Sequence, residues 1–161
     1  IPGAAGLEHR IGGLEKQDKT GNVNYEPDNH EFMIKTRQAK VDKIADYIPL
    51  QQLNLGAEEG DLLVLGWGST SGVITTVVQQ LIKDGHKVSH CHLRYINPFP
   101  KNLGDILKRF KKVIIPEINN GQLITIIRSE FLVDAKGYNK MKGVPITHAE
   151  LEGFLLEQLK G

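Results

Sequence analysis

The most constraining feature of this sequence is a repeated order of short apolar segment, loop and amphipathic segment across residues 61–161. Short apolar runs between turn residues predict strands covered on both faces, and apolar residues at every third or fourth position predict helices with one apolar face. Alternating strands and helices of this length favour right-handed crossovers and a parallel sheet. The sequence therefore predicts an α/β domain over residues 61–161.

The expected strands are short and rich in branched apolar residues: Leu62–Gly66, Lys87–Leu93, Val113–Pro116, and Phe131 to about Tyr138. The expected helices cover residues 73–82, ended by Gly85; residues 103–110; residues 121–129; and a last segment opened by a capping box of Thr147 and Glu150. In such a domain a ligand is expected at the carboxyl ends of the parallel strands. Functional residues are therefore expected in the loops that follow the strands.

Residues 1–27 are rich in Gly, Asn, Asp and Lys and show no apolar period. We expect them to form an irregular arm that continues from a missing upstream domain, because the chain starts without an initiator Met. Residues 28–60 are expected to form a helix and a linker. This helix has Asp28 or Asn29 available as a cap and ends at Pro49. Its predicted apolar stripe consists of Ile34, Val41, Ala45 and Ile48.

Composition and charge exclude several classes of function. Lys and Arg number 20 against 19 Asp and Glu, and a net charge of +1 gives no electrostatic case for binding nucleic acid or an anionic membrane. The single cysteine, Cys91, excludes a disulfide framework and any four-cysteine iron–sulfur or zinc site held by this chain alone. No apolar run approaches the ~20 residues that span a bilayer. These features fit a cytoplasmic protein.

The loop after the first expected strand combines glycines with hydroxyl side chains, in the order Gly66-Trp67-Gly68-Ser69-Thr70-Ser71-Gly72. Glycines let backbone amides approach an anion, and a helix N-terminus attracts negative charge, so one interpretation is a phosphate cradle. The spacing matches neither the dinucleotide-binding fingerprint nor the lysine-bearing P-loop. The other interpretation is a tight strand-to-helix turn with Ser69 or Thr70 as the cap. The sequence leaves both open.

The loop after the third expected strand carries polar residues between Pro116 and Gln122. Asn119 and Gln122 resemble a capping box at the start of the next helix, with Gly121 between them. Glu117 stands at the carboxyl end of its strand, where a carboxylate serves as a base or as a hydrogen-bond acceptor at an interface. No second acid, histidine or nucleophile is adjacent in the sequence, so no catalytic set is predicted.

The run His90-Cys91-His92 lies in an expected strand. Alternate residues of a strand share a face, so His90 and His92 could supply two ligands to a metal ion. No third ligand is identifiable, and Arg94 on the same face would repel a cation. The alternative is a pair of histidines accommodated in a covered sheet, with Cys91 as a small core residue. We expect no metal site here, and no nucleophile elbow of a hydrolase is present.

Several blocks of the sequence, in order, resemble the C-terminal domain of the alpha subunit of 2-oxoacid:ferredoxin oxidoreductases. They are residues 61–70, residues 85–88, residues 93–100 with Pro98-Phe99-Pro100, and residues 113–123 with the Glu-x-Asn-x-Gly-Gln pattern. The front segments Gly6-Leu7-Glu8-His9 and Asn29-His30-Glu31 and the tail Leu132–Lys140 are similar to the 2-oxoglutarate branch. The resemblance covers nearly the whole chain.

This resemblance implies a transketolase C-terminal-like fold: a three-layer α/β sandwich whose mostly parallel sheet has one antiparallel strand. It implies a parent enzyme that oxidatively decarboxylates a 2-oxoacid to an acyl-CoA and reduces ferredoxin. Thiamine diphosphate, Mg²⁺, an iron–sulfur cluster and coenzyme A are the implied cofactors of the holoenzyme, none of them bound by this chain. The implied partners are the upstream domains, the beta subunit and, through the holoenzyme, ferredoxin.

Two hypotheses for the chain itself follow. In the first, it is an assembly and interface scaffold without catalytic residues, inactive alone, whose loops at Ser69, Pro98–Pro100 and Asn119–Gln122 pack against neighbouring domains. In the second, it is a small module that binds a nucleotide or the phosphates of coenzyme A at Gly66–Gly72. The predicted interface or anion-binding residues are Gly66, Gly68, Ser69, Thr70, Gly72, Pro98, Phe99, Pro100, Glu117, Asn119, Gly121 and Gln122.

Overall fold

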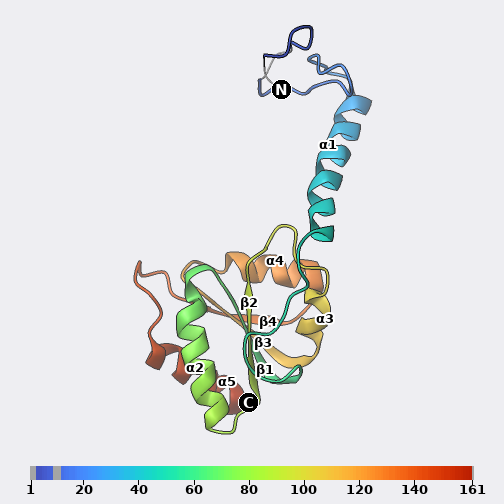
Figure 1. Cartoon of the computed structure of the whole chain (residues 1–161). Coiled ribbons are helices and arrows are strands. Elements are labelled where there is room, and N and C mark those ends of the chain that lie inside the picture. Colours follow the sequence, from blue (N-terminus) through green and yellow to red (C-terminus); the bar gives the residue numbers. More distant parts are fainter. Residues whose placement is uncertain (1–2, 9–11, 161) are drawn as a thin grey trace. The chain divides into compact units, whose positions relative to one another are not determined.

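The chain divides into two units, Ile1–Tyr47 and Ile48–Gly161. The structure is a computed structural model that describes residues 3–8 and 12–160 (Figure 1). His9, from the segment similar to the 2-oxoglutarate branch, lies outside the described residues. Within the described part of the chain, no helix combines the length and the apolar character that a membrane crossing requires.

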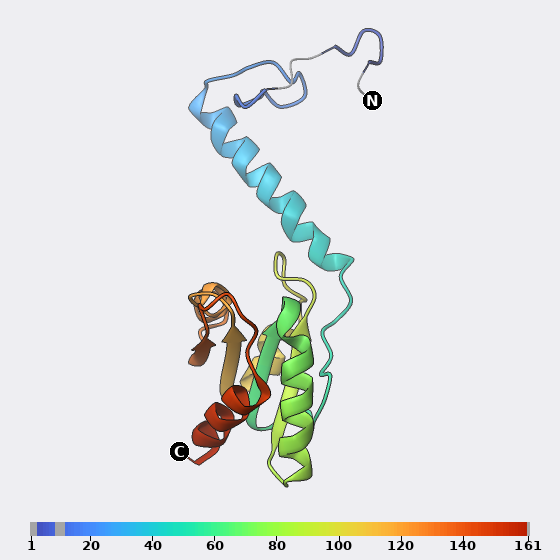
Figure 2. The ribbon, with the colours of Figure 1, turned by 90° about the vertical axis from the view of Figure 1, so that its left-hand side faces the viewer.

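The second unit is built on a four-stranded sheet in the order β2-β1-β3-β4. The strands are β1 (Gly60–Trp67), β2 (Val88–Leu93), β3 (Phe110–Glu117) and β4 (Ala135–Asn139). All three strand pairs are parallel, so the strand arrows point to one edge of the sheet (Figure 2). In the central strand β1, Leu63 pairs with Ser89 on one side and with Val113 on the other. The predicted parallel sheet is confirmed.

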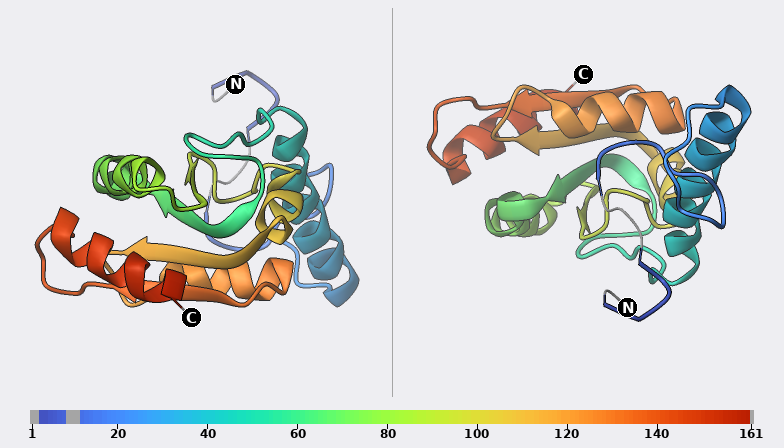
Figure 3. Two further views of the ribbon diagram at one scale, coloured as in Figure 1. Left: turned by 90° about the horizontal axis from the view of Figure 1, so that it is seen from below. Right: turned by 90° about the horizontal axis from the view of Figure 1, so that it is seen from above.

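Helices cover both faces of this sheet (Figure 3). The helices are α2 (Ser71–Lys83) and α5 (His148–Lys160) on one face, and α3 (Leu103–Lys108) and α4 (Gln122–Phe131) on the other. Successive residues of β1 point to opposite faces: Leu62 packs with α2 and α5, and Leu63 with α3 and α4. The alternation explains why β1 is apolar at consecutive positions, and the predicted three-layer α/β sandwich is confirmed.

The expectation of one antiparallel strand is wrong for the described chain, in which every strand pair of this sheet is parallel. The segment before β1 meets the outer edge of β2 at a single antiparallel bridge between Leu55 and His90. The ladder does not extend, because the next N–H on β2, that of His92, donates to the side-chain oxygen of Asn54 at 2.7 Å and not to a backbone carbonyl.

The predicted last strand starts four residues too early. Helix α4 continues to Phe131, and Leu132 follows in the left-handed conformation with φ of +53°. Phe131 packs against Phe99, with ring centroids 5.5 Å apart, and the strand itself begins only at Ala135. An aromatic residue in an apolar run fits a helix end as well as a strand start, so the spacing of the apolar residues does not distinguish helix from strand at Phe131.

The first unit contains α1 (Pro27–Asp42), followed directly by the 3₁₀ helix η1 (Lys43–Asp46). Pro27 occupies the first turn, where its missing N–H costs nothing, and Glu26 holds the N-cap position. The predicted caps are therefore wrong. The Asn29 side chain instead donates to the carbonyl oxygen of Lys16 at 3.0 Å and accepts from the N–H of Asp18 at 3.1 Å. The arm before α1 carries a bridge between Lys16 and Val23.

Candidate functional site at the carboxyl edge of the sheet

The carboxyl edge of the sheet carries two neighbouring cavities. The larger, of about 410 Å³, lies between the N-terminal end of α2 and the segment before α5. Its lining residues are Ser69, Thr70, Val73, Ile118 and Gly143–Ile146. The smaller, of about 190 Å³, is lined by Trp67–Thr70 and Glu117–Asn119. The parallel topology therefore brings the loops after β1 and β3 together, in the crevice where α/β sheets hold ligands.

Glu117 is the most buried charged residue at this edge, with 1% of its surface exposed. Its carboxylate accepts hydrogen bonds from the N–H groups of Leu123 and Ile124, at 3.0 and 3.2 Å, in the first turn of α4. It also accepts one from the indole Nε1 of Trp67 at 3.3 Å. The negative charge thus satisfies free amides at a helix N-terminus and joins β3 to the end of β1. Both oxygens are engaged in holding the fold together.

The other polar residues after β3 shape the turn into α4. Asn119 Oδ1 accepts from the N–H groups of Gly121 and Gln122 at 2.8 and 3.0 Å. The N-cap position belongs to Gly121, with φ of +82°, and not to Asn119, so the predicted capping box is wrong. A Cβ at Gly121 would lie 2.9 Å from Ile124 Cγ2. The acid that accepts the free amides of α4 is Glu117. Because Glu117 is the last residue of β3, it has no helix-capping signal in the sequence.

The glycines after β1 differ in what they do. A Cβ on Gly66 would lie 2.5 Å from Ile74 Cδ1 and 2.8 Å from His92 Nδ1, so this residue must be small for α2 to pack on the sheet. Gly68 lies in the 3₁₀ turn η2 (Gly68–Thr70) with φ of +58°. Gly72, inside α2, has open space where a Cβ would stand. Packing and turn geometry account for Gly66 and Gly68 without a bound anion.

Thr70 holds the N-cap position of α2 but makes no capping bond with its side chain. Its hydroxyl donates to the carbonyl oxygen of Trp67 at 2.8 Å and accepts from the Trp67 N–H at 3.4 Å. It therefore closes the η2 turn. Ser69, in contrast, lines both cavities.

Pro98–Pro100 stand apart from the other two predicted loops, because they line neither cavity. Phe99 packs against the core cluster under α3 and α4, and Pro100 is buried. The Pro100 carbonyl oxygen accepts the N–H of Leu103 at 3.0 Å, at the start of α3. In this structure the Pro-Phe-Pro motif anchors α3 to the sheet.

The wall of the larger cavity that sequence reasoning missed is the segment Gly143–Ile146. Lys140, only 8% exposed, holds this segment by donating to the carbonyl oxygen of Pro145 at 2.8 Å and to Glu150 Oε2 at 2.7 Å. The Thr147 and Glu150 capping box is confirmed, with Thr147 Oγ1 and the Thr147 N–H both bonded to Glu150 Oε2. A lysine before a Gly-Val-Pro turn was the available signal.

Burial lowers the pKa values of both histidines of β2, of which His90 is buried and His92 half-buried. His90 is fully buried, and burial lowers its pKa to about 4; the pKa of His92 is lowered for the same reason. Their rings meet edge to face with centroids 5.6 Å apart. Burial raises the pKa of the Cys91 thiol to about 12, as expected of a small core residue. Across the described residues, no three His, Cys, Asp or Glu side chains group as a metal site would require.

The parallel sheet with helices on both faces, whose loops after β1 and β3 meet at the carboxyl edge, defines an α/β domain with a transketolase-like fold. The solved structure of transketolase from Campylobacter jejuni matches 66% of this chain and 18% of the transketolase chain. The TM-score is 0.50 and the sequence identity 16%, so the likeness shows a shared fold. Residues 60–151 match the family described as pyruvate:ferredoxin oxidoreductase core domain II. The chain belongs to this family.

Three similar proteins, each named for 2-oxoglutarate, point to one branch of this family. The 2-oxoglutarate oxidoreductase subunit KorA from Mycobacterium tuberculosis is 45% identical over all 161 residues, which span 24% of that protein. The 2-oxoglutarate synthase subunit KorA from Methanocaldococcus jannaschii is 32% identical over a match that covers 73% of this chain and 31% of that subunit. The solved 2-oxoglutarate:ferredoxin oxidoreductase from Magnetococcus marinus, with 2-oxoglutarate, coenzyme A and succinyl-CoA bound, matches 98% of this chain and 28% of its own, with 32% identity and a TM-score of 0.88.

The chain thus spans about a quarter of the length of the M. tuberculosis relative. The resemblance to oxidoreductase alpha subunits of the 2-oxoglutarate branch is confirmed by these matches.

Proposed function

We propose that this chain is the C-terminal α/β domain of the alpha subunit of a 2-oxoglutarate:ferredoxin oxidoreductase. The observation that carries the proposal is the 45% identity to 2-oxoglutarate oxidoreductase subunit KorA, which extends over every residue of the chain. The whole enzyme would oxidatively decarboxylate 2-oxoglutarate, join the acyl group to coenzyme A and pass electrons to ferredoxin, in the cytoplasm. Partners would be the remaining domains of the subunit and a beta subunit.

The cofactors of that reaction would be held outside this chain. Thiamine diphosphate with Mg²⁺, the iron–sulfur cluster and coenzyme A are assigned to other domains by the family resemblance. The chemistry of the residues is consistent with this assignment, because the single cysteine is a buried thiol and the Glu117 carboxylate already accepts three hydrogen bonds. The role left to this domain is to position neighbouring domains.

We place that scaffold surface at the carboxyl edge. The side chains of Thr70, Glu117 and Asn119 bond within the domain. Two apolar side chains beside the larger cavity stay half exposed, Ile118 at 48% and Val144 at 52%. Ser69 stands between the two cavities. Apolar side chains around a cavity are the feature that a neighbouring domain would cover on assembly.

The test compares two charge insertions of equal size in the full-length alpha subunit, expressed with its beta subunit. Ile118→Arg alters the carboxyl edge, and Ile82→Arg alters a 38% exposed position near the end of α2. We expect Ile118→Arg alone to reduce copurification of the subunits and ferredoxin reduction with 2-oxoglutarate. Equal, undiminished assembly and turnover in both variants would refute the scaffold surface, and a wild-type enzyme inert toward 2-oxoacids would refute the reaction.

A further inference from the structure

The described residues of the first unit form no buried core. No described residue between positions 3 and 47 is buried. Large apolar side chains remain exposed along its length, among them Tyr25 at 81%, Phe32 at 50% and Ile44 at 48%. An isolated helix of 16 residues such as α1 is marginal in water, because helices gain most of their stability from packing an apolar face.

Three apolar residues of α1 and η1 nevertheless share one side of the helix, whereas Phe32 lies on the opposite side. Ile34 and Val41 are seven residues apart, and Ala45 follows four residues later, so the three lie in line along the helix. Ile34 is 46% exposed, and Val41 and Ala45 are half-buried. These three residues form a narrow apolar face, and the described residues of the first unit supply no core for it.

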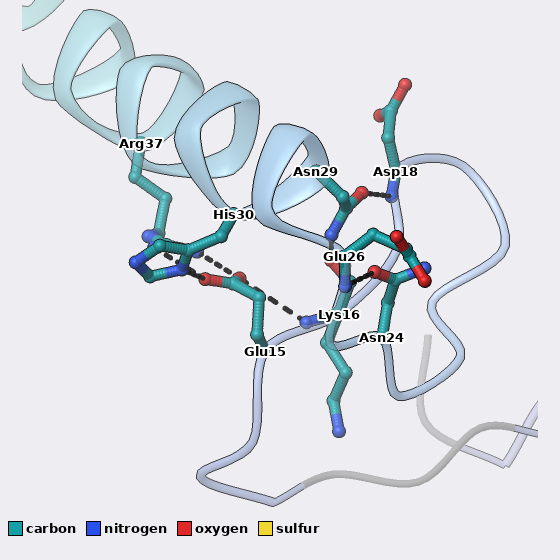
Figure 4. Close-up of polar contacts among 8 residues, drawn as sticks. All are labelled: Glu15, Lys16, Asp18, Asn24, Glu26, Asn29, His30 and Arg37. Atoms are coloured by element: carbon teal, nitrogen blue, oxygen red, sulfur yellow. Dashed lines mark hydrogen bonds and ion pairs between the residues drawn. The ribbon is translucent and has the colours of Figure 1, made fainter.

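A set of polar contacts fixes the arm to α1 between Asn29 and Arg37, as Figure 4 shows. Glu15 accepts two hydrogen bonds from the Arg37 guanidinium, at 2.8 and 3.3 Å, and lies 2.7 Å from His30 Nδ1. Asn29 adds the two backbone contacts to Lys16 and Asp18. Arm and helix are thus connected to each other by charge and hydrogen bonds, and no described residue of the unit buries Ile34, Val41 or Ala45 fully.

We propose that α1 and its attached arm form a docking element, whose stripe of Ile34, Val41 and Ala45 is covered by the remainder of the alpha subunit. This inference rests on the proposal that the chain is one part of a longer subunit, but not on the reaction. Its relatives carry about three quarters of their length outside the matched region. An apolar surface from that part of the polypeptide is the occupant.

Two observations favour this occupant over a second copy of the chain. The match to the solved oxidoreductase covers 98% of the chain, and the first unit is 47 of 161 residues, so the shared fold includes α1. In that protein the matched part belongs to a polypeptide more than three times as long. A surface in the same polypeptide also needs little area for docking, because the tether raises its effective concentration to about the millimolar range.

The experiment measures hydrogen exchange at α1 in the 161-residue chain and in the full-length alpha subunit assembled with its beta subunit. We expect the α1 amides to exchange at least about tenfold more slowly in the assembled subunit, while β1 and β3 are protected in both. Ile34→Glu should abolish the added protection. Thr36→Glu, an exposed position about 200° around the helix from Ile34, is the matched control and should retain it.

Three results would overturn the proposal. Rapid exchange of α1 in both samples would mean that the stripe stays uncovered. Full protection in the 161-residue chain at low concentration would mean that the chain itself covers the stripe, and protection that rises with its concentration would identify a second copy. Failure of the oxidoreductase proposal would look different, because α1 would be protected in an assembled subunit that does not oxidise 2-oxoglutarate.

Discussion

The ammonium group of Lys140 lies 2.7 Å from Glu150 Oε2, and the same oxygen accepts hydrogen bonds from the N–H and the hydroxyl of Thr147. One carboxylate oxygen therefore organises the start of α5 and fixes the lysine that supports the wall of the larger cavity. The Lys140 hydrogen bond is the largest of the interactions that hold the pKa of Glu150 at about 2.

Replacing Lys140 by Met should lower the melting temperature and loosen the segment Gly143–Ile146, because a nearly buried donor to Pro145 and Glu150 is lost. Thermal unfolding measures the first effect and hydrogen exchange the second. Lys142→Met, at an exposed position next to this segment, is the control and should change neither.

The interaction of Lys140 with Glu150 should also depend on pH. The folded pKa of Glu150 lies below its usual value, so the stability contributed by this carboxylate is complete above about pH 4.5 and is lost as the pH falls toward 2. The difference between Lys140→Met and wild type should shrink over that range.

The buried imidazole of His90 should make the domain sensitive to mild acid. Its folded pKa of about 4 is below the ordinary 6.5, so the unfolded chain takes up a proton first and stability falls as the pH drops from 6.5 to 4. The loss from this residue should be of the order of 3 kcal/mol at the lower pH. Urea unfolding at several pH values should show a flatter decline in His90→Leu. His86→Gln is the control, and an equally flat profile there would contradict the assignment to His90.

Removing the Glu117 carboxylate should destabilise the domain and change the surroundings of Trp67. Glu117→Ala leaves two amides of α4 and an indole N–H without their acceptor, at an expected cost of about 3 kcal/mol in unfolding free energy. Trp67 is the single tryptophan, so the folded protein should also show an altered emission spectrum. Glu130→Ala, exposed on the same helix, should leave both readings unchanged.

The two glycines at either end of the loop after β1 should respond oppositely to alanine. Gly66→Ala forces a methyl group against Ile74 and His92 and should cost about 1–3 kcal/mol of unfolding free energy. Gly72→Ala faces open space within α2 and should stabilise by up to about 1 kcal/mol.

The same variants test the phosphate-cradle interpretation. Thermal shift with inorganic phosphate and with coenzyme A should leave the melting temperature of the wild-type chain unchanged, because the glycines serve packing and turn geometry. A ligand-induced rise in melting temperature that Gly72→Ala removes would support the anion cradle instead.

The sheet and its helices could be predicted because their signals are local. Apolar runs marked β1 nearly to its ends but only residues 113–116 of β3. Phe110, the first residue of β3, was wrongly expected in the preceding helix because it continues the apolar spacing of that helix. The Thr147 capping box gave the start of α5. The start of β4 was missed because Phe131 lies in an apolar segment whose turn depends on the left-handed conformation of Leu132, a non-glycine residue.

The candidate site was predicted only in outline. Parallel topology was enough to place the loops after β1 and β3 at one edge. The role of Glu117 could not be predicted, because its partners Trp67 and Leu123 belong to other elements and meet it only in the folded domain. Pro98–Pro100 are predicted to pack against neighbouring domains; the contact of Phe99 with Phe131 within this domain has no signal in the sequence around either residue.

The contacts along the outer edge of β2 set where this domain can be cut. The family match starts at residue 60, but residues 51–57 already bond to the sheet domain. Gln51 exchanges two hydrogen bonds with Asn102, and the N–H groups of Asn54 and Leu55 donate to the carbonyl oxygen of His90. The carbonyl oxygen of Ala57 accepts a hydrogen bond from the Ser89 hydroxyl. A chain shortened to residue 60 would expose the backbone donors and acceptors of β2 and invite edge-to-edge aggregation. The smallest soluble version of the domain therefore begins before Gln51, about ten residues ahead of the first strand of the sheet.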